Sequence, residues 1–319
     1  MRKVLCLLAI AALAAVASCN KGKQVADADD ELVSVSFTVS TGVATRATTY
    51  GDGKLASDLT VQVFRKDVGA GETVVWTPTT PTITKTKLST SPESWTVTMK
   101  LAKTYNYRVG FWAQSASVPA GAFDITDLRA VAVDYTKFAI NNDNLDVFCN
   151  YAEITNMAGS LTETVELKRP LAQVNLLATD YADYVNTVPT ASATALKVAV
   201  KIENVPNTLN VITKETSGEA TLDLAAAAAV NDTFETTEYY YLSMAYILGK
   251  QAQALADATL VLSNDTQTPL ATVTVSNMPY RANYKTNILG QLLTGNATYN
   301  VVIVPAFTTP AYEPTPTVN

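Results

Sequence analysis

Histidine is absent from the 319 residues of the sequence. It is the usual general base near neutral pH and the commonest side chain that binds metal ions. Its absence excludes catalytic Ser-His-Asp and Cys-His groups, and zinc sites built on histidine. Paired carboxylates, Ser-Lys catalysis and oxygen-ligand calcium sites need no histidine, so these chemistries stay open.

Basic residues are fewer than acidic ones. The sequence has 23 lysines and arginines and 29 acidic residues, which gives a formal net charge of −6. No basic cluster interrupts this acidic balance, so neither nucleic acid nor charge-driven docking on anionic lipid is expected.

The one long apolar run lies at the N-terminus. Arg2 and Lys3 precede the apolar run 4–16, which is too short to span a bilayer comfortably, and small residues then lead to Cys19. This arrangement is typical of a lipoprotein signal, because the peptidase needs small side chains before the cut and the thiol receives the lipid. We expect residues 1–18 to be removed and Cys19 to become the lipidated N-terminus. An ordinary secretory signal with an incidental cysteine is the alternative.

Cysteine is almost absent as well. Cys6 leaves with the expected signal and Cys19 is capped by lipid, so Cys149 has no partner within the mature chain. An intrachain disulfide is therefore excluded, and the fold must be held by its hydrophobic core.

The mature chain is long enough for two domains of ordinary size. Residues 19–31 are mainly polar and charged, which predicts a solvated tether between the lipid and the fold. The loop 156–160 marks the approach to the domain boundary. We place an N-terminal β-sandwich domain at 32–165 and a C-terminal β-sandwich domain at 166–319.

Alternation with a period of two dominates both halves of the chain. In the first half Val33, Val35, Phe37 and Val39 interleave with serine and threonine. The same period recurs in further segments, at 59–63, 95–101, 105–111, 196–202, 271–275 and 299–303. Many short half-buried strands separated by turn-forming residues predict an all-β fold of antiparallel sandwiches.

Two segments have helical character. They run from Ile125 to Tyr135 and from Leu222 to Val230, and the second contains five consecutive alanines. Alanine has the highest helix propensity, but the run is short, so we expect a brief connecting helix or loop.

Three segments resemble the fimbrillin family, whose members build fimbriae on bacteria of the Bacteroides and Porphyromonas kind. The first joins 144–148 to 165–176 and is similar to the family's passage from the first domain into the second. The second, 239–248, is similar to an aromatic strand of the second domain. The third, 278–294, carries a basic-Thr-Asn-Ile sequence and a glycine before Leu-Leu-Thr, as in the family's late motif. A related branch of unknown function fits the same motifs.

The resemblance implies two tandem transthyretin-like, Greek-key sandwiches in a fimbrial or adhesin subunit at the surface of the cell outer membrane. The expected partners are other fimbrial subunits through strand exchange, the membrane through the lipid, and a glycan or protein of a host or bacterial surface. No cofactor, metal ion or catalytic residue is expected.

The resemblance also singles out Arg46 and Ala47. In the family a protease that cuts after arginine can remove the first strand, and a strand from the next subunit then fills the groove. Here the alternating segment 32–40 precedes Thr45-Arg46-Ala47, so a cut would remove that strand and the lipid together. The alternative is that Arg46 is a solvated loop residue and the strand stays paired. The proline-bearing tail 308–319 is unsuited to donating a strand, which favours a tip or accessory position.

Two further clusters have ordinary structural explanations. The oxygen-rich segment 141–146 lacks the order of an EF-hand and its late glutamate, so an Asx-type turn is favoured over a calcium site. Tyr239, Tyr240, Tyr241 and Tyr246 are assigned to core packing with one exposed edge, in preference to a platform for stacking sugars.

Three functions are weighed against one another. The first is a fimbrial or adhesin subunit that works by strand complementation and contact, without turnover. The second is a surface glycan-binding lipoprotein of a nutrient-uptake system. A hydrolase ranks last, because histidine is absent and no nucleophile motif is found.

N-terminal sequencing of protein taken from the native cell surface distinguishes a cleaved chain from one that keeps its lipid anchor. We expect Ala47 as the first residue if the strand is removed during assembly. A lipidated Cys19 would instead show a retained anchor, and any other first residue would contradict both forms.

Overall fold

The structure is a computed structural model of the chain. It describes residues 31–42, 50–71, 75–86, 94–187, 195–230, 232–233, 239–264, 269–295 and 297–304. The expected signal and residues 19–30 of the expected tether lie outside the described residues.

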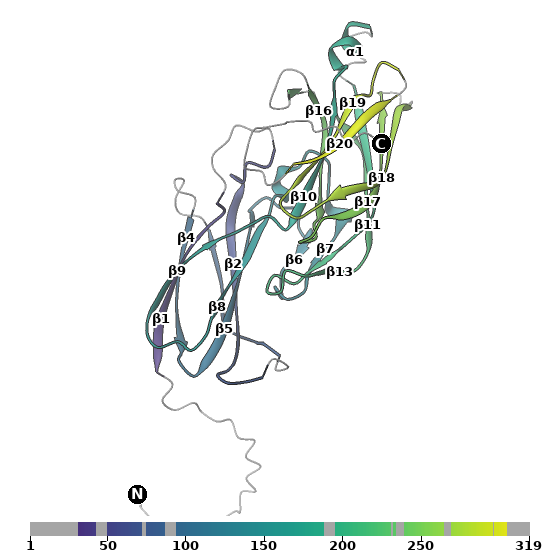
Figure 1. Ribbon diagram of the computed structural model, residues 1–319. Helices are drawn as coiled ribbons and strands as arrows, with labels where there is room; N and C mark the ends of the chain where they lie inside the picture. Colours follow the sequence, from purple (N-terminus) through teal and green to yellow (C-terminus); the bar gives the residue numbers. More distant parts are fainter. Residues whose placement is uncertain are drawn as a thin grey trace, which may run out of the picture.

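The first sandwich is built from two facing sheets (Figure 1). One has three strands in the order β4-β1-β9, and the other has four in the order β3-β2-β5-β8. The strands are β1 (Leu32–Ser40), β2 (Ala56–Asp67), β3 (Thr77–Thr86), β4 (Ser94–Ala102), β5 (Tyr105–Ser115), β8 (Phe148–Ile154) and β9 (Leu161–Glu166).

The second sandwich follows along the long axis of the molecule (Figure 1). A five-stranded sheet in the order β15-β16-β10-β19-β20 faces a four-stranded sheet in the order β14-β11-β17-β18. The strands are β10 (Leu171–Ala178), β11 (Lys197–Val205), β14 (Ala220–Ala228), β15 (Asp232–Thr233), β16 (Tyr240–Leu248), β17 (Ala254–Ser263), β18 (Pro269–Tyr280), β19 (Lys285–Gln291) and β20 (Thr298–Val304).

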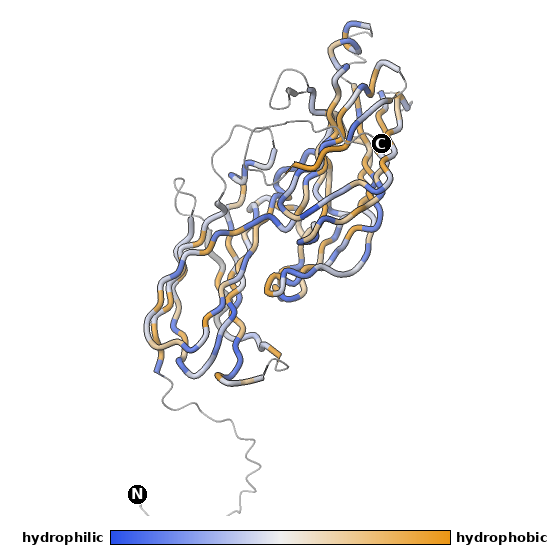
Figure 2. Tube along the Cα trace, in the orientation of Figure 1, coloured by the Kyte–Doolittle hydropathy of each residue, from blue (hydrophilic) through white to orange (hydrophobic). Residues whose placement is uncertain are grey.

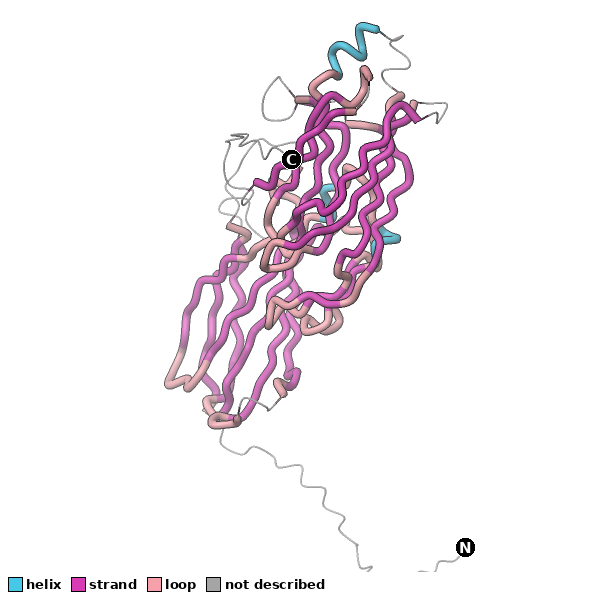
Figure 3. The backbone as a smooth tube through the Cα atoms, turned by 45° about the vertical axis from the view of Figure 1, so that its right-hand side comes forward, coloured by secondary structure: helices cyan, strands magenta, loops and turns pink. Residues whose placement is uncertain are grey.

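Short elements link the two halves of the chain. A small sheet has the order β13-β12-β7-β6, and its central pair joins the second half to the first, with Thr208 opposite Ala132. Figure 3 shows how little helix accompanies the strands. The short elements are β6 (Phe123–Asp124), β7 (Val131–Val133), β12 (Thr208–Leu209), β13 (Thr216–Ser217), η1 (Tyr135–Lys137), η2 (Asp143–Leu145) and α1 (Tyr181–Thr187).

Alternating burial explains why these segments form strands. In β1 the side chains of Val33, Val35, Phe37 and Val39 are buried, and Thr38 on the other face is exposed. Apolar and polar residues therefore alternate along the trace of such strands in Figure 2. The burial of the apolar residues places them between the two sheets. The predicted all-β fold of tandem sandwiches is confirmed.

Each sandwich contains one parallel pair in an otherwise antiparallel arrangement. Strand β1 pairs antiparallel with β4 and parallel with β9, while β10 pairs antiparallel with β16 and parallel with β19. The first strand of each sandwich thus lies inside its sheet, between two later strands. Period-two alternation does not encode strand direction, so the sequence did not predict these parallel neighbours.

The side chains form two hydrophobic cores. One lies in the first sandwich, and the larger one lies in the second and takes in residues of the segment 122–147 together with Phe64 and Trp112. The larger core therefore contains residues from both sides of the domain boundary that the sequence places after residue 165. That boundary stays a prediction.

The two segments with helical character do not form α-helices. Residues 131–133 are strand β7, and the run of alanines continues β14, which is paired antiparallel with β11. Leu222 and Leu224 are buried at alternate positions of β14, so core packing and cross-strand hydrogen bonds outweigh the helix propensity of the alanines. The expectation of a brief helix or loop at 222–230 was wrong.

Replacing Phe37 by alanine tests the importance of β1 to the first core. The Phe37 ring is fully buried and packs edge-on against Phe111, with ring centroids 5.2 Å apart. We expect Phe37→Ala to lower the free energy of unfolding by about 3–5 kcal/mol, because it leaves a cavity. Chemical denaturation measures this loss. Thr38→Ala on the exposed face is the matched control, with an expected change within about 0.5 kcal/mol, and equal losses would contradict the assignment.

Candidate functional site

Strand β1 is held on both sides by hydrogen-bonded neighbours. Its register with β4 extends from Leu32 opposite Ala102 to Ser40 opposite Ser94, and its register with β9 begins at Val35 opposite Leu161. Because β1 lies between these strands, both of its edges are paired. The space that it fills is therefore bounded by two strand edges and by the core of the first sandwich.

A glycine in the left-handed region follows the end of β1. Gly42 has a positive φ of 63°, and the side chain of Glu166 lies over it, with Cγ 2.6 Å from where a Cβ atom would be. The positive φ favours glycine at this position, because a larger residue would be strained there. Arg46 and Ala47 lie outside the described residues, between Gly42 and Tyr50, and Cys19 also lies outside them.

Gly51, which follows Tyr50, contacts a buried ion pair. Arg169 donates from Nε to Oδ1 of Asp146 at 2.7 Å and from Nη2 to Oδ2 at 2.8 Å, and both side chains are only 2% exposed. Nη2 also donates to the backbone carbonyl of Gly51 at 2.6 Å, and the guanidinium lies 4.5 Å from the ring centroid of Phe148. Burial is the largest single influence and disfavours the charge of Arg169, but the attraction and hydrogen bonding of Asp146, together with Tyr246 and Asp143, outweigh it and raise the pKa of Arg169. The bidentate geometry satisfies the guanidinium where water is excluded.

The carboxylate of Asp143 binds the other backbone group of Gly51. Oδ1 of Asp143 accepts a hydrogen bond from the backbone N–H of Gly51 at 2.9 Å and another from the Tyr246 hydroxyl at 2.8 Å. Burial, together with the negative charge of Asp146, raises the pKa of Asp143 to about 6. Both backbone polar groups of Gly51 are thus bound to side chains of the junction between the sandwiches.

The motifs of the fimbrillin resemblance converge on this junction. The first motif supplies Asp146 and Arg169, the second supplies Tyr246, and the third supplies Lys285, whose positive charge acts on Asp146. The sequence reasoning missed the ion pair. The pattern that could have indicated the ion pair is the aspartate between two apolar residues at 145–147. A charged side chain in an apolar segment needs a buried partner of opposite charge.

The oxygen-rich segment forms turns, as expected. Oδ1 of Asn142 accepts a hydrogen bond from the backbone N–H of Asn144 at 3.2 Å and caps η2, and Asn141 has a positive φ of 60°. Among the described residues, no group of three or more acidic or cysteine side chains is placed to hold a metal ion.

The four tyrosines separate into two groups. Tyr241 and Tyr246 are buried, whereas Tyr239 and Tyr240 are half-buried, and the Tyr240 ring lies 4.6 Å from that of Tyr181. Core packing with an exposed edge describes this arrangement. In the part of the chain that the structure describes, no helix has the length and apolar character needed to cross a membrane.

Asp143→Asn isolates the effect of the raised pKa. The folded-state pKa of about 6 exceeds the ordinary value of 3.8, so this group stabilises the fold most below that value, and the contribution is lost as pH rises through about 6. The amide oxygen of asparagine can accept both hydrogen bonds but cannot titrate. We expect the stability of the wild type relative to Asp143→Asn to increase as pH falls from about 7 to about 4. Urea unfolding across that range measures the difference, and a pH-independent difference would contradict the assignment.

Comparisons with known proteins place the chain among relatives. No curated protein matches its sequence. It is similar in fold to a candidate cell adhesion protein from Bacteroides uniformis, with 11% identity, a TM-score of 0.49, and coverage of 86% of this chain and 98% of that one. It is also similar to the tip fimbrial protein Mfa3 from Porphyromonas gingivalis, with 10% identity, a TM-score of 0.45, and coverage of 86% and 99%. The fimbrial anchor protein Mfa2 from the same organism has 13% identity, a TM-score of 0.42, and coverage of 85% and 96%.

The family comparison covers most of the chain. Residues 27–319 match a family described as a family of unknown function, DUF6562. This agrees with the expectation, from the sequence, of a branch of unknown function. The chain belongs to the DUF6562 family.

Proposed function

We propose that the mature chain is a cell-surface fimbrial or adhesin subunit that assembles or anchors by β-strand complementation. The observation that carries the proposal is the position of β1. It is a central strand with a fully buried apolar face, and the residues between it and β2 in the sequence include Arg46 and Ala47. The protein then works by binding, without turnover.

Removal of residues 19–46 would open a specific groove. The edge of β4, opposite nine residues of β1, and the edge of β9, opposite six, would lose their partners. Each backbone group left buried and unpaired costs about 1–3 kcal/mol, and the apolar slot would be exposed to water as well. Insertion of a strand from a neighbouring subunit removes both penalties.

The register defines what the inserted strand must look like. It must run antiparallel to β4 and parallel to β9, as β1 does. It must also place apolar side chains at alternate positions, because Val33, Val35, Phe37 and Val39 occupy the core at that spacing. A strand shifted by one residue would direct polar side chains into the core.

The junction keeps the cut chain in place. A new N-terminus at Ala47 lies four residues before Gly51, whose N–H and C=O are bound by Asp143 and Arg169. The body of the molecule would therefore keep its fold around β2 while the groove is open.

The lipid distinguishes two places of the subunit in an assembly. An uncut chain keeps lipidated Cys19 and acts as an anchor at the outer membrane. A cut chain loses the lipid together with β1 and accepts a strand from a neighbouring subunit.

A surface glycan-binding lipoprotein of a nutrient-uptake system is the second candidate. The half-buried rings of Tyr181 and Tyr240 favour it, since aromatic faces near the surface can stack on sugars. Retained lipid on Cys19 together with saturable polysaccharide binding would distinguish this function from the first.

Arg46→Lys tests the cleavage step. An arginine-specific protease does not cut after lysine, so we expect this variant to keep lipidated Cys19 and to form no polymer ladder on a gel. Ala47→Ser is the matched control, because it changes the other side of the same bond and leaves the arginine in place. Mass spectrometry of the N-terminus and gel analysis of surface material measure both results. Polymers of Arg46→Lys as abundant as those of the wild type would overturn the proposal.

A further inference from the structure

Cations and aromatic rings alternate in a row across the first sandwich. Lys66 Nζ lies 4.9 Å from the ring centroid of Trp76, and the guanidinium of Arg108 lies 4.7 Å from the same ring. The Arg108 guanidinium is also 5.9 Å from the ring of Tyr151, and Lys214 Nζ is 5.4 Å from that ring. We call these five residues the cation–aromatic row.

The row lies on the outer face of the sheet β3-β2-β5-β8. Its members come from β2, the residue before β3, β5 and β8, and the row ends with a residue of the second half of the chain. Gly110 explains how that half approaches, since a Cβ atom there would lie 3.1 Å from Ile212 and 3.2 Å from Leu128. This close packing brings the turn that carries Lys214 against β8.

The positive charges of the row are only partly neutralised. Arg108 contacts Glu153 at 3.4 Å, and its Nε is buried without a hydrogen-bond partner. Lys66 and Lys214 form no ion pair with any described residue. Charges held against rings are oriented before a ligand arrives, which lowers the entropic cost of binding.

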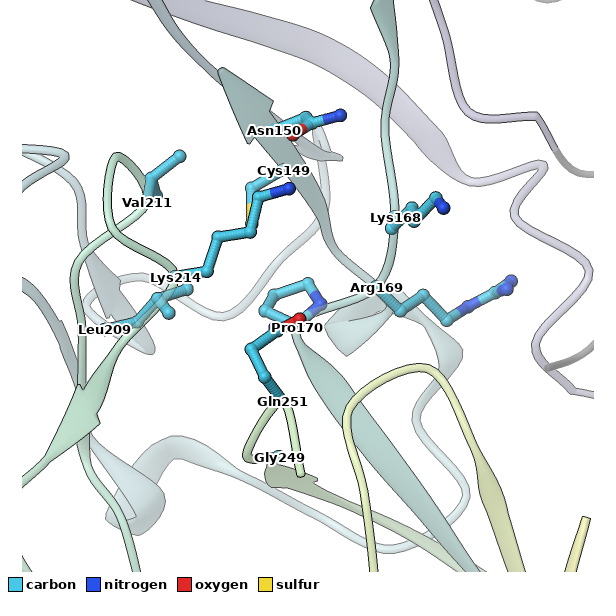
Figure 4. Close-up of a pocket in the computed structure, with 10 residues that line it drawn as sticks. All are labelled: Cys149, Asn150, Lys168, Arg169, Pro170, Leu209, Val211, Lys214, Gly249 and Gln251. Carbon is cyan, nitrogen blue, oxygen red and sulfur yellow. The ribbon is translucent and has the colours of Figure 1, made fainter. Parts of the chain in front are cut away.

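A pocket continues the row toward the junction of the sandwiches. Lys214 reaches toward Cys149 from one side of this pocket, and Lys168 lines it from the other, as Figure 4 shows. The row and the pocket thus place Lys66, Arg108, Lys214 and Lys168 along one surface of a chain whose net charge is negative.

We propose that this surface binds an acidic polysaccharide with carboxylate or sulfate groups along its chain. The spaced cations match repeated anionic groups, and the rings offer apolar edges to the faces of sugar rings. Glu153 and Asp127 lie beside the row, where each pairs with an arginine. Such carboxylates can accept hydrogen bonds from the sugar hydroxyls that lie between the anionic groups of a glycan and that a DNA backbone lacks, so a glycan fits the surface better than DNA.

The proposal goes beyond strand exchange. Strand β1 lies in the other sheet of the first sandwich, so the row is present whether β1 or a donated strand fills the groove. Binding of polysaccharide and uptake of a strand can therefore be measured separately, and each can fail without the other.

A calorimetric titration of the mature chain with oligogalacturonate tests the site. We expect saturable binding that weakens with added salt, and at least about tenfold weaker binding for Lys66→Gln/Lys214→Gln. Lys100→Gln/Lys197→Gln is the matched control, because it removes the same charge from β4 and β11 and should bind like the wild type. Thermal unfolding verifies that both double variants are folded.

Several results would overturn the proposal. They are the absence of binding to both oligogalacturonate and chondroitin sulfate, equal weakening in the two double variants, and equal affinity for a neutral galactan. Single-stranded DNA that competes as well as oligogalacturonate would show that the ligand class is wrong.

Discussion

The buried ion pair of Arg169 and Asp146 is the interaction on which the arrangement of the molecule depends. Two charges removed from water are stable only when each is fully bonded, and here the bonding needs three segments that are distant in the chain. Asp146 precedes β8, Arg169 precedes β10, and Gly51 precedes β2. The ion pair therefore fixes the positions of the first sandwich, the second sandwich and the chain at Gly51 relative to one another. Loss of any one segment would leave a charge or a backbone group without its partner.

Local patterns of the sequence predicted local structure well. Alternation in β1 indicated both its strand character and its buried face, since these depend on adjacent residues alone. Pairing was beyond the same reasoning: the parallel neighbours β9 and β19, and the partner of Asp146, are each determined by folding of distant segments. In the alanine-rich strand β14 the local pattern itself was misleading. The helix propensity of the alanines is strong, but the packing of Leu222 and Leu224 in the core outweighs it. The proposed cleavage residues Arg46 and Ala47 came from resemblance, and Cys19 from the signal pattern.

The two sheets of the first sandwich have different tasks in the proposed function. The sheet β4-β1-β9 contains the strand that is to be exchanged, so its contacts must be separable. The sheet β3-β2-β5-β8 contains the cation–aromatic row and packs through Gly110 against Leu128 and Ile212, so it stays attached to the second sandwich. One sandwich can thus assemble through one face and bind ligand through the other, without competition for the same side chains.

The parallel pairing of β1 with β9 has a consequence for biogenesis. Strand β1 is the first part of the fold to be synthesised, and β9 is the last strand of its sandwich, so the sheet cannot close until the chain has been made to residue 166. Contacts between such distant segments form slowly. The second sandwich repeats this delay, since β10 must wait for β19. Late closure would keep the chain unfolded during the export that the expected N-terminal signal implies.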